Sequence, residues 1–367
     1  MRLIPIECVR ESSCLGRTIY DDNGRILLKT GTKLTKAVIK KIQEMKIYSI
    51  YIVDEYSKEE VEDVIRPELR QKSIAVVKET FNNIERIAKE KEPGPKAALI
   101  KKNNEYFRSI YSVAEEMISN ILSNNNILVS LVDIKSMDNY TYQHSVNVAV
   151  ISLVMGISLK MHKRDLLELC LGALTHDIGK AFIPKDITTK NTDFTIEENS
   201  KYKEHTQKGY DYLRSNFSLK AGSRMASLQH HERIDGLGYP EGITGDKIHE
   251  YAKIVSIANC YDVLTSDCAY RRSIPASDAL EYIMAHVNTL FDFDLVNLFS
   301  RIIVTYPAGT IVKLSNGDIA SVQSTPPNFP LRPTVKIIKS IDKGREGQVI
   351  DLLNELSLVV INVEYNI

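Results

Sequence analysis

The sequence predicts a mainly α-helical protein with a small α+β module at its N-terminus and a small β appendage at its C-terminus. From residue 57 to about residue 300, apolar residues recur at helical spacing. Before and after this stretch, short alternating runs flank Asn-Gly pairs, which are typical of β-hairpins. We therefore expect four segments: an accessory module (1–56), a helical connector (57–124), a catalytic domain (125–303) and the β appendage (304–367).

The N-terminal module is expected to contain a hairpin turn at Asn23-Gly24, a helix over residues 35–47 and a strand over 49–55. It holds no histidine, which favours a sensory, regulatory or oligomerising role over catalysis, with a plain packing module as the alternative. The connector is amphipathic and is broken at Pro93-Gly94-Pro95, so it could pair with its copy in a homodimer. A second hairpin turn is expected at Asn316-Gly317 in the β appendage.

The composition excludes several classes of function. The 367 residues include 47 basic and 47 acidic side chains, so no net charge draws the chain to a nucleic-acid polymer or an anionic membrane. The five cysteines form no CxxC pair, which argues against a disulfide framework and a thiolate zinc site and favours a cytoplasmic location. The N-terminus lacks a signal-peptide pattern and no apolar run is long enough for membrane insertion.

The chemistry is expected in the helical domain, because all eight histidines lie between residues 144 and 286. The apolar stretch ELCLGALT ends in His176 and Asp177, followed by Gly179 and Lys180. Burying ionisable groups in a core costs on the order of several kcal/mol of folding free energy, unless the groups pair with one another or bind a metal. The carboxylate of Asp262 lies in another nearly apolar stretch, so we expect it to have a buried partner.

Each of the remaining histidines is ambiguous by itself. A single buried histidine is more often a hydrogen-bonded core residue than a ligand, so the argument rests on the set. Imidazoles and carboxylates without thiolates suit Fe, Mn, Zn or Co, and a carboxylate such as Asp177 can bridge two ions. Such a pair of ions generates a hydroxide for in-line attack on phosphorus. The further candidates in this set are His144, His205, His230 and His231.

Four motifs, YTYQHSVNVA, HDIGK, HHERIDGLGYP and YDVLTSDCAYR, occur in this order between residues 125 and 300. In this respect the sequence closely resembles the HD-GYP domain, a branch of the HD phosphohydrolase superfamily. The resemblance implies a helical, HD-type metallohydrolase domain that hydrolyses cyclic di-GMP to the linear dinucleotide or to GMP. It leaves open another cyclic dinucleotide, another HD phosphohydrolase activity, or a weakly active signalling and binding module.

The resemblance also assigns roles to individual residues. One metal is expected to be bound by His144, His176, Asp177 and Asp262, and the second by His205, His230 and His231, with Asp177 and a nucleophilic hydroxide between them. Catalysis is assigned to Asp177 and to Lys180, which is expected at the scissile phosphate. The substrate pocket, and a surface for signalling partners, are expected to involve the loop that contains Arg233, Asp235, Gly236, Gly238, Tyr239 and Pro240. Substrate phosphate is expected to be bound by Arg271 and its neighbour Arg272.

Two departures from the family pattern qualify these expectations. Members with a third metal carry a glutamate four residues before the first histidine, where this chain has Tyr140. We therefore predict two divalent ions, Fe or Mn, rather than three. The family often reads RPYR where this chain has Cys268-Ala269-Tyr270-Arg271, so one basic substrate contact is missing.

Overall fold

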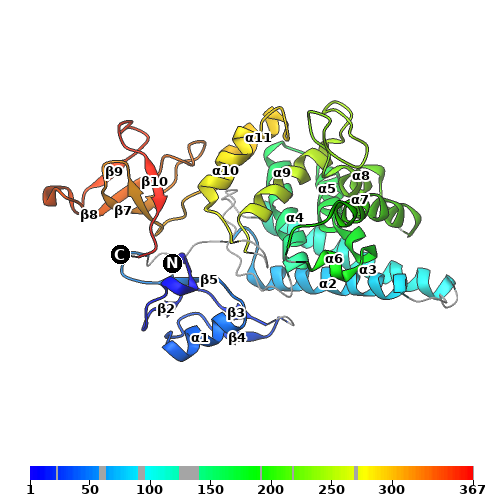
Figure 1. Cartoon of the computed structure of the whole chain (residues 1–367), viewed down its shortest axis with the longest axis horizontal. Coiled ribbons are helices and arrows are strands. Elements are labelled where there is room, and N and C mark those ends of the chain that lie inside the picture. Colours follow the sequence, from blue (N-terminus) through cyan, green and yellow to red (C-terminus); the bar gives the residue numbers. More distant parts are fainter. Residues whose placement is uncertain are drawn as a thin grey trace.

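The computed structural model describes residues 1–21, 24–57, 63–89, 96–123, 140–190, 192–216, 219–267 and 272–366. A large helical domain lies at one end of the molecule, and two small β-containing modules formed by the two chain ends lie at the other (Figure 1). The predicted mainly α architecture is confirmed. Among the described residues, no helix combines the length and the apolar character needed to cross a membrane.

The N-terminal module is built around a short three-stranded sheet. The central strand β5 (Ser49–Val53) pairs antiparallel with β1 (Arg2–Pro5) and β2 (Cys14–Leu15). A short helix η1 (Ile6–Cys8) follows β1, and β3 (Ile19–Tyr20) and β4 (Ile26–Leu28) form the predicted hairpin. Helix α1 (Lys36–Glu44) begins where the Thr35 side chain accepts a hydrogen bond from the Val38 amide. The expected helix and strand are therefore present, whereas Asn23 lies outside the described residues.

The segment predicted as a connector forms a helical hairpin of α2 (Pro67–Lys89) and α3 (Lys96–Leu122). Its buried side chains, such as Phe81 and Met117, belong to the same hydrophobic core as those of the domain that follows. The predicted amphipathic pattern is confirmed, because these side chains pack into the core of this chain, whereas pairing with a second copy stays a prediction. The boundary predicted near residue 124 lies outside the described residues.

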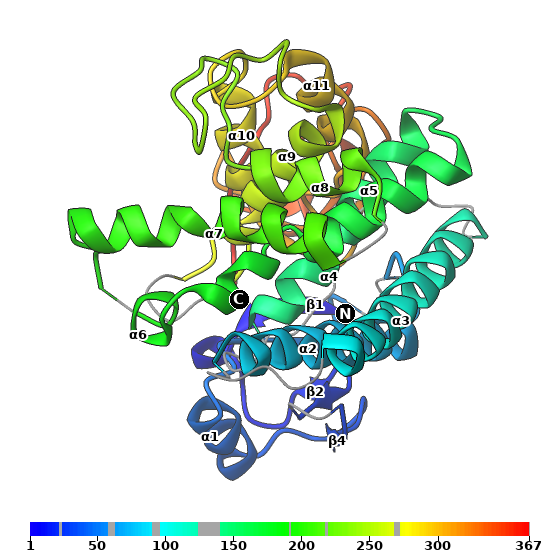
Figure 2. The same ribbon diagram turned by 90° about the vertical axis from the view of Figure 1, so that its right-hand side faces the viewer.

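The helices α4 (Tyr140–Ser158), α5 (Lys163–Thr175), α8 (Ala221–Gln229) and α9 (Glu250–Leu264) form the centre of the helical domain (Figure 2). Helix α4 is buried on all sides from Gln143 to Gly156. The periphery consists of η3 (Ile178–Phe182), α6 (Lys185–Thr188), α7 (Ile196–Asn216), α10 (Ala276–Ala285) and α11 (Phe293–Ile302).

A glycine sets the approach of η3 to α7. A Cβ added to Gly179 would lie 1.8 Å from the carbonyl oxygen of His205, so only glycine allows this contact. The close approach at Gly179 is thus made to the backbone of α7. This packing brings the segment after α5 beside the histidine carried by α7.

The C-terminal appendage is a five-stranded antiparallel sheet in the order β10-β6-β7-β8-β9. Its strands are β6 (Ile311–Leu314), β7 (Ile319–Ser324), β8 (Thr334–Lys339), β9 (Val349–Asp351) and β10 (Val360–Val363), with a short helix η4 (Lys343–Arg345). The predicted turn joins β6 to β7, and Gly317 has the positive φ of 90° that the turn requires. Tyr365 packs against the core of the N-terminal module, so the two chain ends meet.

Candidate metal centre

Two groups of potential ligands meet around the carboxylate of Asp177. Its Oδ2 atom lies 3.4 Å from Nε2 of His176 and 3.8 Å from Nε2 of His144. Its Oδ1 atom lies 3.5 Å from Nε2 of His205 and 3.8 Å from Nε2 of His230. Each carboxylate oxygen therefore faces a different group, as a bridging ligand would. Within each group the ligand atoms lie within 4.8 Å of one another; the groups are His144, His176 and Asp177, and His205, His230 and His231.

Backbone carbonyls orient three of these imidazole rings. Nδ1 of His176 lies 2.7 Å from the carbonyl of Ala173, and Nδ1 of His205 lies 2.7 Å from that of Tyr202. Nδ1 of His230 lies 3.0 Å from the carbonyls one turn earlier in α8. Since a carbonyl only accepts, Nδ1 carries the proton and the lone pair of Nε2 faces Asp177. The helix backbone thus prepares these rings as ligands.

The donors fit a divalent metal ion. Nε2 of His176 and Oδ1 of Asp177 are buried without a hydrogen-bond partner, an arrangement that costs free energy unless a cation satisfies them. Burial lowers the pKa of His205 to about 4 and also lowers the pKa of His230 and His231 well below the usual range. The imidazoles are therefore neutral at pH 7, which is the form that binds a metal.

Asp262 has the buried partner that the sequence predicted. Its Oδ2 atom lies 2.7 Å from Nδ1 of His144, and its Oδ1 atom accepts a hydrogen bond of 2.9 Å from the side-chain amide of Asn147. The carboxylate is fully buried and lies behind His144, outside the converging ligand atoms. This contact orients His144 toward Asp177, whereas direct coordination by Asp262 stays a prediction.

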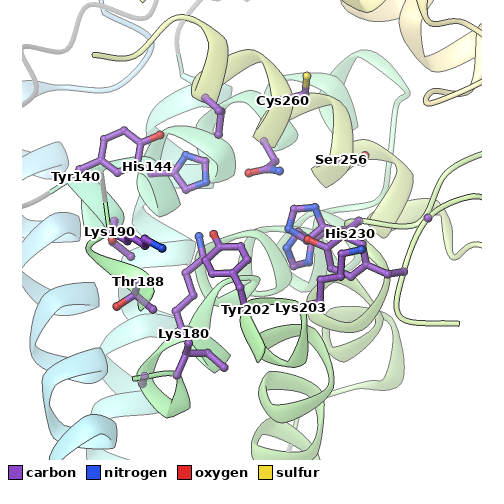
Figure 3. Close-up of a pocket in the computed structure, with 18 of the residues that line it drawn as sticks. Tyr140, His144, Lys180, Thr188, Lys190, Tyr202, Lys203, His230, Ser256 and Cys260 are labelled. Atoms are coloured by element: carbon purple, nitrogen blue, oxygen red, sulfur yellow. The ribbon is translucent and has the colours of Figure 1, made fainter. Parts of the chain in front are cut away.

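Lys180 forms an ion pair with the central carboxylate. Its Nζ atom lies 2.5 Å from Oδ2 of Asp177, and it points into the cavity beside Tyr202 (Figure 3). Burial alone would raise the pKa of Asp177, but the ammonium of Lys180 and the nearby histidines hold it well below its usual value. Burial opposes the charge of Lys180 as well, yet Asp177 raises its pKa, so the side chain stays cationic.

A cavity of about 1020 Å³ opens in front of these residues. It reaches from the histidines across η3 and α6 to Phe81 and Glu85 of α2, and Lys46 of the N-terminal module also lines it. Its wall is rich in cations and aromatic rings, a combination suited to an anionic ligand with stacking surfaces. These side chains are Lys180, Lys185, Lys190, Lys203, Arg233, Tyr140, Tyr202 and Tyr239.

The loop after the histidine pair is anchored by Glu232, which the sequence analysis did not single out. Its buried carboxylate accepts hydrogen bonds of 2.7, 3.2 and 3.2 Å from the amides of Glu241, Gly242 and Ile243. A Cβ on Gly238 would lie 2.5 Å from Cα of Glu232, so the loop folds back tightly on the histidine segment. The only hint in the sequence was an acidic residue between the histidines and the glycines.

The predicted loop residues divide into two sets. Arg233, Gly238 and Tyr239 line the cavity, whereas Asp235 and Gly236 do not. Asp235 instead pairs with Arg233 through contacts of 3.0 and 2.5 Å, and Gly236 adopts a positive φ of 79°. Gly236 therefore shapes the loop, and Asp235 orients Arg233. The ring of Tyr239 stacks on His231, a ligand candidate, with centroids 4.7 Å apart.

The structure corrects the placement of Arg272. Its guanidinium lies 3.0 Å from a carboxylate oxygen of Glu7 and 3.9 Å from the centre of the Tyr48 ring, so it contacts the N-terminal module and does not line the cavity. Adjacency to Arg271 in the sequence did not reveal which way the side chain points. Arg271 itself lies outside the described residues. Tyr140 lines the cavity with its ring nearly parallel to that of His144, at 5.8 Å.

Known proteins resemble this chain over its helical domain and its C-terminal sheet. Residues 116–295 match a family model described as the HD domain, and residues 311–365 match a KOW domain associated with the HD domain. A cyclic di-GMP phosphodiesterase of Pseudomonas aeruginosa is 32% identical over 247 residues, 64% of this chain and 59% of that protein. A 3'3'-cGAMP-specific phosphodiesterase of Vibrio cholerae is 33% identical over 162 residues, 44% of this chain and 35% of that protein.

A solved structure shows the same fold. An HDG"Y"P protein from Bdellovibrio bacteriovorus matches with a TM-score of 0.51 and 18% identity, covering 81% of this chain and 97% of that one. Residues 116–295 therefore form an HD domain, and the two groups of potential ligands lie within it. The resemblance of its four motifs to the HD-GYP branch agrees with this match, since both similar proteins named above are cyclic-dinucleotide phosphodiesterases.

Proposed function

We propose that this protein hydrolyses cyclic di-GMP to the linear dinucleotide or GMP at a centre of two divalent ions, Fe or Mn. The observation that carries the proposal is the carboxylate of Asp177, whose two oxygens face two separate groups of histidines. The resemblance to a cyclic di-GMP phosphodiesterase supports the choice of substrate. Because the chain covers only 59% of that relative, the activity of the whole protein is part of the proposal.

The expected ligands divide between the two ions around Asp177. One ion would be held by His144 and His176, with Asp262 as a further expected ligand, and the other by His205, His230 and His231. Two such ions supply a hydroxide nucleophile at neutral pH and neutralise charge on the phosphate oxygens. The three imidazoles whose Nδ1 atoms are bound to backbone carbonyls support this assignment.

The residues around the cavity bind and orient the substrate. Lys180 stays cationic and would contact the scissile phosphate. Lys203 also lines the cavity, with its ammonium 4.9 Å from the centre of the Tyr239 ring. Arg233, held by Asp235, would contact a second anionic oxygen. The aromatic rings of Tyr202 and Tyr239 offer stacking surfaces for the bases. The exposed Leu237 of the same loop is where a signalling partner would bind.

A second candidate substrate is 3'3'-cGAMP, because one relative is named for that activity. The two dinucleotides share the phosphates and ribose rings and differ in one base. The metal centre and the lysines would treat them alike, so discrimination must occur at the base-binding walls of the cavity. Both substrates therefore belong in the same assay.

The experiment is anaerobic purification, elemental analysis and hydrolysis of both dinucleotides by the same sample. We expect two ions per chain and faster turnover of cyclic di-GMP. The Asp177→Ala variant should lose both metal occupancy and turnover, because both groups share this carboxylate. Three ions per chain would contradict the two-metal centre, and two bound ions without hydrolysis of either dinucleotide would contradict the proposed activity.

A further inference from the structure

A buried polar network runs from helix α2 to the metal centre. The guanidinium of Arg70 is 2% exposed and donates hydrogen bonds of 3.0 and 2.7 Å to the two carboxylate oxygens of Asp63. Its Nη1 atom donates a bond of 2.5 Å to the side-chain oxygen of Asn147 in α4. The amide of Asn147 in turn donates to Oδ1 of Asp262, at 2.9 Å. The chain of contacts thus ends on the carboxylate that holds His144.

Arg70 determines which way the amide of Asn147 points. A guanidinium can only donate, so the oxygen of Asn147 must face Arg70 and its NH₂ group must face Asp262. With Oδ1 of Asp262 bound in this way, Oδ2 is directed at His144. The side chains of Asn147 and Asp262 are fully buried, so no water competes for these positions.

The network also reaches the N-terminal module. Nη2 of Arg17, which precedes strand β3 of that module, lies 3.6 Å from Oδ2 of Asp63. The module makes a second contact beyond the end of α9, where the Ser49 hydroxyl donates a bond of 3.3 Å to Asp267. Helix α9 carries Asp262. The N-terminal module therefore contacts both the buried network that ends on this carboxylate and the segment that follows its helix.

We propose that Arg70 and Asn147 are positioning residues for Asp262, and that Arg17 couples the N-terminal module to the same metal ligand set through Asp63. The inference rests on the metal centre of the proposed function, but not on the identity of its substrate. The network supports only the group of His144, His176 and Asp177. In the other group, His205 and His230 take their orientation from carbonyls of α7 and α8 instead.

This asymmetry gives a measurement that a general folding role would not reproduce. Asn147→Ala should weaken binding of one of the two ions by about 10- to 100-fold, the usual effect of removing a residue that orients a ligand. The second ion should bind as in the natural protein. Equilibrium dialysis at graded free Mn²⁺, followed by elemental analysis, would show one ion per chain where the natural protein holds two.

Ser152→Ala is the matched control, because Ser152 is a buried polar residue of the same helix without a hydrogen-bond partner for its hydroxyl. It should keep both ions at natural affinity. Equal weakening of both ions in Asn147→Ala would show a general structural role and overturn the inference, as would unchanged binding of both. Two bound ions in the natural protein without dinucleotide hydrolysis would contradict the proposed function alone.

The coupling to the N-terminal module is tested by Arg17→Gln. The Arg17 side chain is partly exposed, so this variant should fold and can be measured even if Asn147→Ala does not fold. We expect the same ion to bind about twofold to fivefold more weakly, the range of a partly screened ion pair. Lys36→Gln, which removes an exposed pair with Glu11 at 3.7 Å in the same module, should have no effect. Identical affinities in both variants would overturn the coupling.

A second readout needs no bound metal. In metal-free protein labelled with ¹⁵N-histidine, the ring nitrogen shifts of His144 report its contact with Asp262. Arg70→Lys keeps the charge but loses the paired hydrogen bonds, and it should shift the His144 signals while those of His286, which is bonded to the Tyr282 carbonyl, stay unchanged. Unchanged His144 signals would overturn the role of Arg70.

Discussion

The ammonium of Lys180 lies 2.5 Å from Oδ2 of Asp177, the same oxygen that faces His144 and His176. The cation therefore belongs to the candidate metal centre and not only to the wall of the cavity. It helps to keep Asp177 ionised, since it is the strongest influence that lowers the pKa of this buried carboxyl. The same ammonium is directed toward the cavity where a phosphate would bind.

Replacing Lys180 separates these two roles. Lys180→Met should lower kcat by about 10²- to 10³-fold, the usual effect of removing a group that stabilises transition-state charge. Metal content should be retained, because the histidines stay in place. Lys180→Arg keeps the charge and should retain more activity. Elemental analysis and steady-state kinetics on the same samples test this, and loss of metal from Lys180→Met would show that the residue is needed for the ligand set instead.

The sequence predicted the helical domain and the candidate ligands because both depend on local patterns. The interrupted apolar stretch before His176 could be recognised without knowing what packs against it, and the structure brings six of the seven predicted ligands into two close groups. Asp262 is different, since its contact with His144 spans 118 positions and places it behind that ring. A motif identifies such a residue but does not show whether it touches a metal or another ligand.

The parts that the sequence missed depend on tertiary contacts. In the sequence, Arg70 resembles an ordinary surface cation of an amphipathic helix. Only the fold shows that its side chain is buried and that it is bonded to Asn147, which lies 77 positions later in the chain. The neighbour of Arg272 in the sequence predicts a place at the substrate, but its half-exposed side chain contacts Glu7 and Tyr48 of the N-terminal module. The direction of a side chain in a loop is set by what packs on it, which local spacing does not contain.

The tight fold of the loop after the histidine pair can be tested at Gly238. An added Cβ would lie 2.4 Å from the amide nitrogen of Arg233, against backbone that cannot yield without moving the loop. Gly238→Ala should lower kcat/KM by displacing Arg233 and Tyr239, while both ions stay bound. Gly344→Ala, where the nearest atom is a side-chain oxygen at 3.2 Å, is the control. Natural kcat/KM in Gly238→Ala would show that the loop does not shape the substrate site.

Glu232 should be the anchor of the same loop. Its carboxylate accepts hydrogen bonds from three backbone amides, and a glutamine would weaken them and present an NH₂ group to a donor. Glu232→Gln should reduce the free energy of unfolding by about 1–3 kcal/mol and speed proteolysis within residues 233–245. Glu241→Gln, an exposed change in the same loop, should do neither. Urea denaturation and limited proteolysis with mass spectrometry measure both effects.

The buried histidines predict how the stability of the metal-free protein depends on pH. Burial lowers the pKa of His205 to about 4, whereas a histidine in the unfolded chain has a pKa of about 6.5. Between these values the unfolded chain binds more protons, so stability is fully present above about pH 6.5 and falls as the pH drops toward 4. Urea denaturation of chelator-treated protein across this range should show the loss. His205→Asn should show a shallower dependence, and equal slopes for the two proteins would contradict the burial of a neutral imidazole at this position.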